Sequence, residues 1–447
     1  MKPKTTEIPT LRSIGHASRV LGRIGIGCLL TVTLAALVSC AAKRLDPPPE
    51  DVPYHLPWGA VPVESWEPTL ARSFHQDLVE GVRARVAIAR RDNPKSRVPY
   101  RTLALSGGGS RGAFGAGTLI GWTEYGSRPQ FDVVTGISTG AMMATFAFLG
   151  SDYDDGLRLY TETSTNDIYH KRSRLKGMFS DAFADTAPLR QLIADQLTEE
   201  TLAQVARAHA AGRRLFVGTV NLDANAFTVW DMGAIAASDR PDKLQRYRDV
   251  ILASASIPVL FPPVYIPVEI DGERYWQMHV DGGVREAIFF YDYLDELARA
   301  VAKVGLDFDK EVHPELFVVH NGTLYAEATN EPVKPRSLSI AAASVENLMR
   351  KNTVSSLYRL WVQAMTHGAD FHIAYIPPEF DVDWDAEEFD PEKMRRLFDF
   401  AYQRAAKGTA FVTQRAVSNF DELIELLDPM QVLDPLEARP QFRREQR

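Results

Sequence analysis

Cysteine is scarce in this sequence: the chain of 447 residues has only two, Cys28 and Cys40. A framework of structural disulfides is therefore excluded, and the fold must depend on its core. An excess of basic residues is also absent, because the formal net charge is −8, and this argues against a nucleic-acid partner. Hydrophobic residues make up 45% of the chain, so disorder is not expected.

The N-terminus has the layout of a secretory signal peptide, which we place at residues 1–39. Five basic residues and one acidic residue precede an apolar segment from Ile24 to Val38. Leu37-Val38-Ser39-Cys40 resembles a bacterial lipobox, and the resemblance implies cleavage before Cys40, lipidation of that residue and export to a membrane. The absence of an acidic residue at positions 41 and 42 favours the outer membrane over the inner one. An uncleaved membrane anchor is the alternative.

Four further segments are expected after the signal peptide. Residues 40–65 contain prolines at 47–49, 53, 57 and 62, which is typical of an extended tether. Residues 66–100 contain an amphipathic pattern, with apolar residues every four positions from Leu70 to Val86, and we expect a helix that packs on the main domain. The main domain is placed at 101–425, and residues 426–447 are expected to form a loose tail.

The main domain opens with two successive units of strand, glycine-rich turn and helix. Residues 102–105 indicate a buried strand and 113–122 a helix, and residues 131–135 indicate a second strand before another helix. This βαβα order predicts an α/β fold of three layers, with a central, mostly parallel sheet and helices on both faces. Further strands are expected at 214–220, 226–231, 264–268, 275–280, 316–320 and 371–376, and further helices at 189–197, 339–365 and from 390.

The second turn is the pentapeptide Gly136-Ile137-Ser138-Thr139-Gly140. A serine on a sharp turn between strand and helix has its Oγ exposed, and a glycine two residues away on either side lets the strand and the helix approach each other. The pattern predicts a nucleophile elbow, with Ser138 as the nucleophile and Gly136 and Gly140 as its supporting glycines.

The first turn, Gly107-Gly108-Gly109-Ser110-Arg111-Gly112, is called the glycine loop here. Its backbone N–H groups lie at the start of a helix, where they can bind an oxyanion or a phosphate. The spacing of its glycines also fits a dinucleotide site, but such a site needs an acidic residue at the end of the second strand, and Asp132 is at the beginning. A Walker loop is excluded because no Gly-Lys-Ser or Gly-Lys-Thr follows.

A serine nucleophile needs a base, and the sequence offers two candidates. Asp281-Gly282-Gly283 follows an expected strand, and its glycines would let another loop approach the carboxylate. His320 ends another apolar strand, which keeps open a triad of serine, aspartate and histidine in α/β-hydrolase order. The other histidines lack the spacing of metal ligands.

Four blocks in this order resemble the patatin-like phospholipase family over residues 101 to about 420. They are the glycine loop, the Ser138 pentapeptide, Asp281-Gly282-Gly283 and, before that, the stretch from Ala253 to Pro263. The resemblance implies a dyad of Ser138 and Asp281, with Gly107, Gly108, Gly109, Arg111 and Gly112 forming the oxyanion hole. For Arg111 it implies a role in fixing the loop or in meeting a phosphate headgroup, and a surface arginine is the alternative.

The implied activity is hydrolysis of carboxylic esters in phospholipids, lysophospholipids or neutral lipids, with an acyl-serine intermediate and no metal or cofactor. The implied partners are a lipid substrate and a membrane reached through Cys40, and no motif specifies an oligomeric state. A lipoprotein that binds a lipid or a partner without turnover is the alternative from another class. Residues 152–183 are interpreted as surface helix and loop, or as a lid or rim at the entrance of the site.

Overall fold

The computed structural model describes residues 44–50, 56–61, 97–173, 180–289, 312–324, 332–381 and 384–414, together with positions 79, 81–83, 85, 87, 298 and 302. The predicted signal peptide, the lipidation site Cys40 and the predicted tail 426–447 lie outside these residues. Within the described ranges, no helix has both the length and the hydropathy needed to cross a bilayer.

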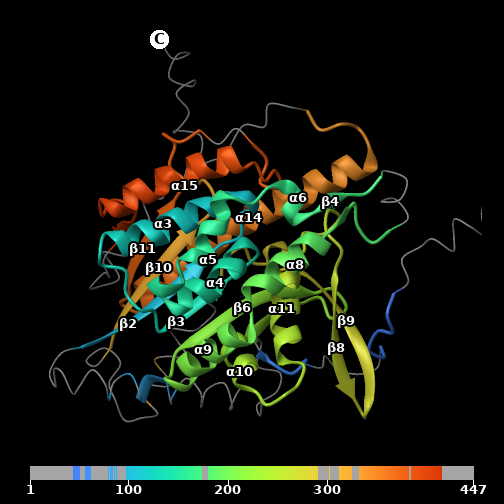
Figure 1. Ribbon diagram of the computed structural model, residues 1–447, viewed down its shortest axis with the longest axis horizontal. Coiled ribbons are helices and arrows are strands. Elements are labelled where there is room, and N and C mark those ends of the chain that lie inside the picture. The colour runs from blue at the N-terminus through green and yellow to red at the C-terminus, as the bar shows by residue number, and fades with distance from the viewer. Residues whose placement is uncertain are drawn as a thin grey trace, which may run out of the picture.

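The described residues form a sheet of ten strands with a parallel centre (Figure 1). The parallel strands are, in spatial order, β6 (Arg214–Asn221), β3 (Val133–Gly136), β2 (Val98–Leu105), β10 (Val312–His320) and β11 (Asp370–Tyr375). Antiparallel strands extend the two edges: β7 (Ala226–Asp231), β1 (Ala60–Val61), β9 (Glu273–Asp281) and β8 (Val264–Ile270) beyond β6, and β12 (Val412–Gln414) beyond β11.

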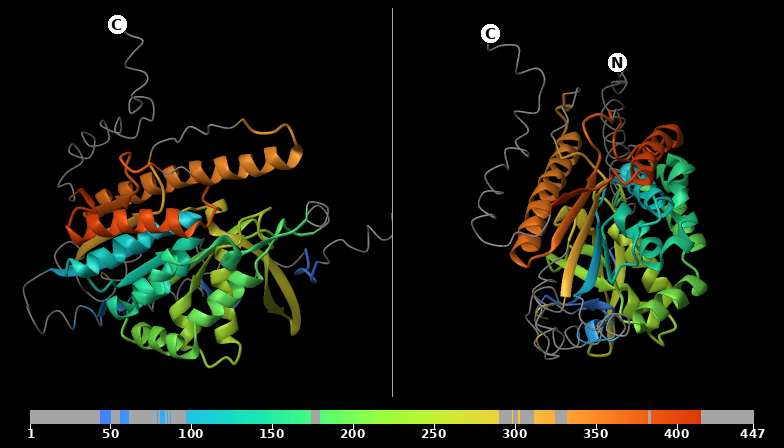
Figure 2. Two further views of the ribbon diagram at one scale, coloured as in Figure 1. Left: turned by 45° about the horizontal axis from the view of Figure 1, so that its top comes forward. Right: turned by 90° about the vertical axis from the view of Figure 1, so that its left-hand side faces the viewer.

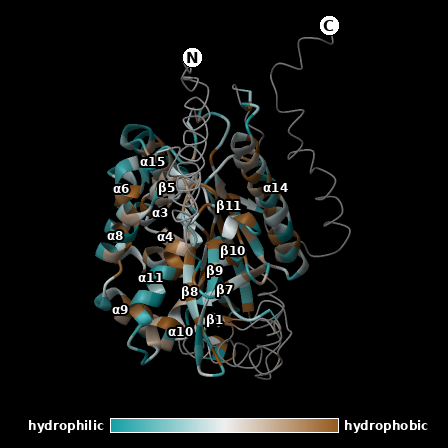
Figure 3. Ribbon diagram, turned by 90° about the vertical axis from the view of Figure 1, so that its right-hand side faces the viewer, coloured by the Kyte–Doolittle hydropathy of each residue, from teal (hydrophilic) through white to brown (hydrophobic). Residues whose placement is uncertain are grey.

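Helices cover both faces of this sheet, so the predicted three-layer α/β fold is confirmed. Figures 2 and 3 show α14 (Ser337–Thr366) on one side of the strands and the other long helices on the opposite side. The opposite layer contains α3 (Gly112–Glu124), α4 (Thr139–Leu149), α8 (Ala187–Gln196), α9 (Glu199–Ala210), α11 (Lys243–Ser254) and α15 (Pro391–Ala406).

Each face of the sheet has its own hydrophobic core, because successive side chains of a strand point to opposite faces. In β10, Phe317 and Val319 pack under the α3 and α15 layer, whereas Leu316 and Val318 pack under α14. The burial of Val on both faces explains why the central strands read as continuous apolar runs.

Shorter elements connect these layers. They are α5 (Asp155–Arg158), α6 (Thr165–Ile168), α10 (Met232–Ala237), the 3₁₀ turns 109–111, 151–153, 159–161 and 282–284, and a separate pair of strands, β4 (His170–Lys171) and β5 (Ala184–Asp185). The helices α9, α10 and α11 were absent from the sequence-based expectations. In α11 the signal existed, because Tyr247, Val250 and Ile251 are buried at helical spacing.

The described part of the predicted tether contacts the domain. Arg44 forms an ion pair with Asp223 at 2.7 Å, and the backbone N–H of Trp276 in β9 donates to the carbonyl of Asp46 at 2.9 Å. Further along, Ala60 and Val61 pair with β7 as β1. These residues are therefore part of the surface of the folded domain, and not a free spacer.

Positions 79, 81–83, 85 and 87 are helical, within the segment predicted to be an amphipathic helix. Val79 and Val82 are buried in the core under α14, and Arg85 forms an ion pair with Asp132 at 2.9 Å. At these positions the helix packs on the main domain, as expected from its apolar stripe. Leu70 and Val86, at the two ends of that stripe, lie outside the described residues.

Candidate active site

Ser138 lies at the turn between β3 and α4, with φ 54° and ψ −124°. A positive φ is strained for a residue other than glycine, and such strain concentrates at functional sites. The two flanking glycines are needed for packing, because a Cβ on Gly136 would lie 2.6 Å from the carbonyl oxygen of Gly140, and a Cβ on Gly140 would collide with that of Leu105. The predicted elbow is present in the backbone.

Ser254 holds this elbow in place from α11. The backbone N–H of Ser138 donates to Ser254 Oγ at 3.0 Å, and that hydroxyl donates in turn to the carbonyl of Gly218 in β6 at 2.7 Å. Ser254 belongs to the sequence block from Ala253 to Pro263, but the sequence alone gave it no role. Its contact joins the nucleophile turn to two elements that are more than 70 positions away.

Asp281 ends β9 and is fully buried. Its Oδ1 accepts a hydrogen bond from the backbone N–H of Gly283 at 2.7 Å, whereas Oδ2 has no hydrogen-bond partner among the described residues. Burial raises the pKa of Asp281 to about 7, and the nearby Ser138 hydroxyl and the Gly283 N–H offset part of that increase. The carboxyl group is therefore close to Ser138 and able to bind and release a proton near neutral pH.

The glycine loop lies against Ser138. A Cβ on Gly107 would be 3.2 Å from the Cβ of Ser138. Four of the loop's amides are already engaged: that of Gly107 donates to the carbonyl of Ala287, that of Ser110 to Ala386, that of Arg111 to Gly108, and that of Gly112 to carbonyls within the loop. Among the described residues, the amides of Gly108 and Gly109 have no acceptor.

These two amides are thus the donors available for a ligand within the predicted oxyanion set. Gly109 lines the same pocket as Ser138. Gly108 has φ 154° and Gly109 has φ 56°, both in the range that favours glycine, so the chain reaches this arrangement only with glycine at both positions.

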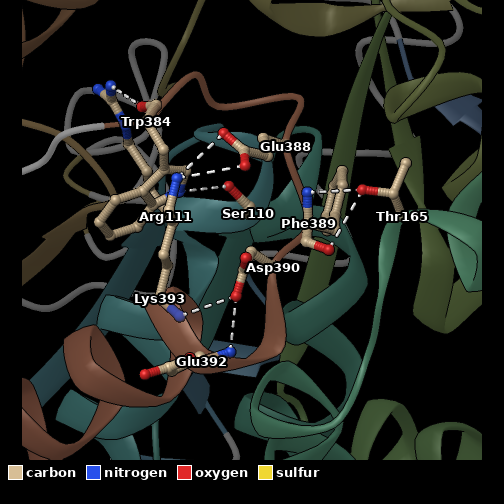
Figure 4. Close-up of polar contacts among 9 residues, drawn as sticks. All are labelled: Ser110, Arg111, Thr165, Trp384, Glu388, Phe389, Asp390, Glu392 and Lys393. Carbon is tan, nitrogen blue, oxygen red and sulfur yellow. Dashed lines mark hydrogen bonds and ion pairs between the residues drawn. The ribbon is translucent and has the colours of Figure 1, made fainter.

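Arg111 fixes the glycine loop from outside. One of its guanidinium nitrogens, Nη2, donates to the carbonyl of Trp384 at 3.1 Å (Figure 4). Of the interpretations open at the level of sequence, this contact favours the role of holding the loop.

His320 lies behind the glycine loop. Its Nδ1 is 3.1 Å from Ser106 Oγ, and its Nε2 is 3.4 Å from the carbonyl oxygen of Thr323. Burial lowers the pKa of His320 to about 4, so the ring is neutral at pH 7. Both ring nitrogens therefore contact groups other than Ser138, whereas the Asp281 carboxyl group lies near the Ser138 hydroxyl.

Ser138 and Gly109 line an apolar pocket that is partly open to solvent. Aliphatic and aromatic side chains from several elements form most of its lining: Met142, Phe146, Leu159, Tyr160, Ile168, Leu189, Leu192, Ile193, Ile251, Phe261, Phe389 and Met394. Such a lining suits a long hydrocarbon group. Because Leu159, Tyr160 and Ile168 belong to the segment 152–183, that segment supplies part of the pocket wall and is more than ordinary surface.

The loop after Asp281 is held by α14, which the sequence did not connect with the site. Asn352 donates to the carbonyl of Val284 at 2.7 Å, and Glu286 accepts from Ser356 at 2.8 Å and from Arg359 at 2.7 Å. No local motif marks these residues, because their partners lie about 70 positions away. Among the described residues there is no group of three or more His, Cys, Asp or Glu side chains that could hold a metal ion.

Comparison with known proteins finds a curated relative and a solved structure that are similar to parts of this chain. A curated relative, a cGAMP-activated phospholipase of Pseudomonas aeruginosa, is 29% identical over 170 residues, which are 36% of this chain and 48% of the relative. The chain therefore matches about half the length of that relative. Among solved structures, VipD from Legionella pneumophila aligns over 71% of this chain and 68% of its own, with 14% identity and a TM-score of 0.34.

Residues 103–292 match the family described as patatin-like phospholipase. This range includes Asp281, the glycine loop and Ser138, and Gly109 of that loop and Ser138 line the apolar pocket. Over residues 103–292, the chain is therefore similar to the patatin-like phospholipase family.

Proposed function

We propose that this protein is a serine lipid acyl hydrolase that cleaves carboxylic esters. The observation that carries the proposal is the presence of three features around Ser138, which lines an apolar pocket: a strained turn that holds this serine, a buried carboxyl group with its pKa raised to about 7, and two backbone amides without acceptors. The family of residues 103–292 supports the same chemistry.

In the proposed reaction, Ser138 Oγ attacks the ester carbonyl carbon while Asp281 takes the hydroxyl proton. The amides of Gly108 and Gly109 donate to the oxyanion of the tetrahedral intermediate, whose charge is greater than that of the ground-state carbonyl. Collapse of the intermediate breaks the bond to the alcohol, which leaves with the proton from Asp281. Water activated by Asp281 then hydrolyses the acyl-Ser138 ester and restores both groups.

The apolar pocket supports an acyl chain as the group that the enzyme recognises. Burying each methylene of such a chain contributes about 0.8 kcal/mol, so a chain of several carbons gives substantial binding energy without any polar contact. Phospholipids, lysophospholipids and neutral lipids all supply this group.

The proposal includes a membrane location through acylated Cys40, with the outer membrane favoured over the inner one. Acyl chains on the protein would raise its local concentration at a lipid substrate. Metabolic labelling with an alkyne fatty acid tests this part. Wild type should be labelled and Cys40→Ser should not, and equal labelling of both proteins would contradict it.

The catalytic proposal is tested with the full chain in mixed detergent micelles, on a p-nitrophenyl acyl ester and a labelled phospholipid. Ser138→Ala and Asp281→Asn should each lower kcat by at least about 10²-fold, because a general base alone contributes roughly 10²–10⁴. His320→Gln should retain activity within about tenfold, since His320 contacts Ser106 and Thr323.

Loss of activity in His320→Gln, with an unchanged melting temperature, would favour the triad. If folded wild type hydrolyses no ester, the protein instead binds lipid or a partner without turnover. Covalent labelling by a fluorophosphonate, measured by mass spectrometry, distinguishes two explanations of such a result. Labelled Ser138 is reactive and the true substrate was not among the esters tested, whereas unlabelled Ser138 is inert.

A further inference from the structure

Residues 384–390, called the strap here, run from Trp384 to Asp390 immediately before α15. They lie outside the range that matches the family, 103–292, and no short motif marks them. Ala386, Glu387 and Phe389 of the strap line the same apolar pocket as Ser138 (Figure 4 shows the strap beside the glycine loop).

The first half of the strap is bonded to the glycine loop through three hydrogen bonds. The indole N–H of Trp384 donates to Ser110 Oγ at 3.0 Å, and the backbone N–H of Ser110 donates to the carbonyl of Ala386 at 2.8 Å. The carbonyl of Trp384 accepts the third, from Arg111 at 3.1 Å. Ser110 is fully buried and Trp384 nearly so, which means that solvent does not compete for these contacts.

The strap also explains the backbone of Gly109. With φ 56°, this residue turns its Cα towards the strap, and a Cβ there would collide with the carbonyl oxygen of Ala386. The strap and the glycine loop are therefore in direct backbone contact at one of the two amides that have no acceptor.

The second half of the strap is fixed to other elements. Phe389 exchanges backbone and side-chain hydrogen bonds with Thr165 at the start of α6, at 2.8 to 3.2 Å, and Tyr169 donates to the carbonyl of Glu387 at 3.1 Å. Asp390 caps α15 by accepting from the amides of Glu392 and Lys393 at 2.9 and 3.2 Å. The strap thus connects the glycine loop to α6 and α15, and both of these helices contribute a residue to the pocket wall.

We propose that Trp384 is a positioning residue: through Ser110 it holds the amides of Gly108 and Gly109 where the oxyanion forms. This inference rests on the proposed ester hydrolysis. Oxyanion donors act only when they are aimed at the developing charge before the reaction, and misplacement by about 1 Å costs up to about 10²-fold in rate. Ser110 directly follows Gly109 in the chain, and neither Ser110 nor Trp384 is among the residues that line the pocket.

The test removes the hydrogen bond between the indole N–H of Trp384 and Ser110. Trp384→Phe keeps an aromatic ring and removes the donor to Ser110, Ser110→Ala removes the acceptor, and the double variant removes both. The matched control is Trp122→Phe at the far end of α3, because the indole of Trp122 also donates to a serine, Ser127, at 3.0 Å. Steady-state kinetics, melting temperatures and hydrogen exchange of peptides that cover 107–112 are measured on the full chain in mixed micelles.

We expect Trp384→Phe and Ser110→Ala each to lower kcat on the order of tenfold, which is less than the loss of one donor outright, with KM within about twofold. The double variant should lose no more than either single variant, because both remove the same contact. Trp122→Phe should keep the wild-type kcat at a comparable melting temperature. Amides of the 107–112 peptide should exchange faster in Trp384→Phe and in Ser110→Ala, and at the wild-type rate in Trp122→Phe.

Three results would overturn the proposal: a wild-type kcat in Trp384→Phe, a loss that appears in KM instead of kcat, or losses that multiply in the double variant. If wild type itself hydrolyses no ester, the proposed function has failed, and hydrogen exchange alone decides the role of the strap. Faster exchange at 107–112 in Trp384→Phe would still support it, and unchanged exchange would overturn it.

Discussion

The raised pKa of Asp281 makes the pH dependence of hydrolysis a sharp test of the dyad. A base must be ionised to accept the Ser138 proton, so kcat/KM should follow the ionised fraction of Asp281 in the free enzyme. Burial raises the pKa of this carboxyl group to about 7 from an ordinary 3.8. Activity should therefore rise from pH 5 to pH 8 and then reach a plateau.

The size of the effect follows from this pKa. With a pKa of about 7, roughly 1% of Asp281 is ionised at pH 5 and about 90% at pH 8, so kcat/KM should rise about 90-fold. A carboxyl group at its ordinary pKa would be about 94% ionised already at pH 5, and the rate would be almost flat. The two cases differ by nearly two orders of magnitude.

The assay measures kcat/KM on an acyl ester between pH 5 and 8, with the released acid quantified by chromatography so that detection is independent of pH. Circular dichroism at each pH confirms that the protein stays folded. A kcat/KM that stays constant down to pH 5 would refute the reasoning. So would a residual activity of Asp281→Asn that falls with pH in the same way as that of wild type.

Three further predictions concern stability and specificity. Between about pH 4 and pH 7 the folded protein holds a proton on Asp281 that the unfolded chain releases, so the free energy of unfolding should fall as pH rises through this range. Asp281→Asn should therefore be more stable than wild type at pH 8, by up to about 4 kcal/mol. At pH 4 the variant should have no such advantage. Calorimetry that finds the variant less stable at pH 8 would contradict this. Gly109→Ala should lose activity and about 1–3 kcal/mol of stability, since its φ of 56° and the Ala386 carbonyl leave no place for a Cβ; a wild-type melting temperature and rate would count against the described loop. Leu192→Phe narrows the pocket and should lower kcat/KM for long acyl chains by about tenfold relative to short ones; equal losses at all chain lengths would show that the chain binds elsewhere.

The site residues that could be predicted from sequence are those at positions where the local backbone geometry permits only certain residue types. At the turn that holds Ser138, a Cβ on Gly136 would collide with the backbone of Gly140, and a Cβ on Gly140 would collide with Leu105 on the neighbouring strand β2. The parallel centre of the sheet could be predicted for a similar reason, because strands buried on both faces leave continuous apolar runs in the sequence.

The rest of the site depends on contacts between distant positions. Trp384 and Arg111 are 273 positions apart, and Asn352 and Val284 are 68 apart. A tryptophan that donates one hydrogen bond, or an asparagine in a helix, has no local pattern that distinguishes it from many others in the chain. The same holds for the oxyanion set, where only the folded loop shows that the amides of Gly107, Arg111 and Gly112 are already engaged.

The ion pair between Arg44 and Asp223 would limit how far the domain could lie from a lipid anchor on Cys40. If Cys40 carries the lipid, the anchor is four positions from Arg44, and a fully extended chain of that length would reach roughly 14 Å. A free spacer from 40 to 65 would reach about 90 Å and would let the domain tumble. If Cys40 is lipidated as proposed, the ion pair would instead keep the edge of the sheet at β9, the strand that ends in Asp281, close to the membrane.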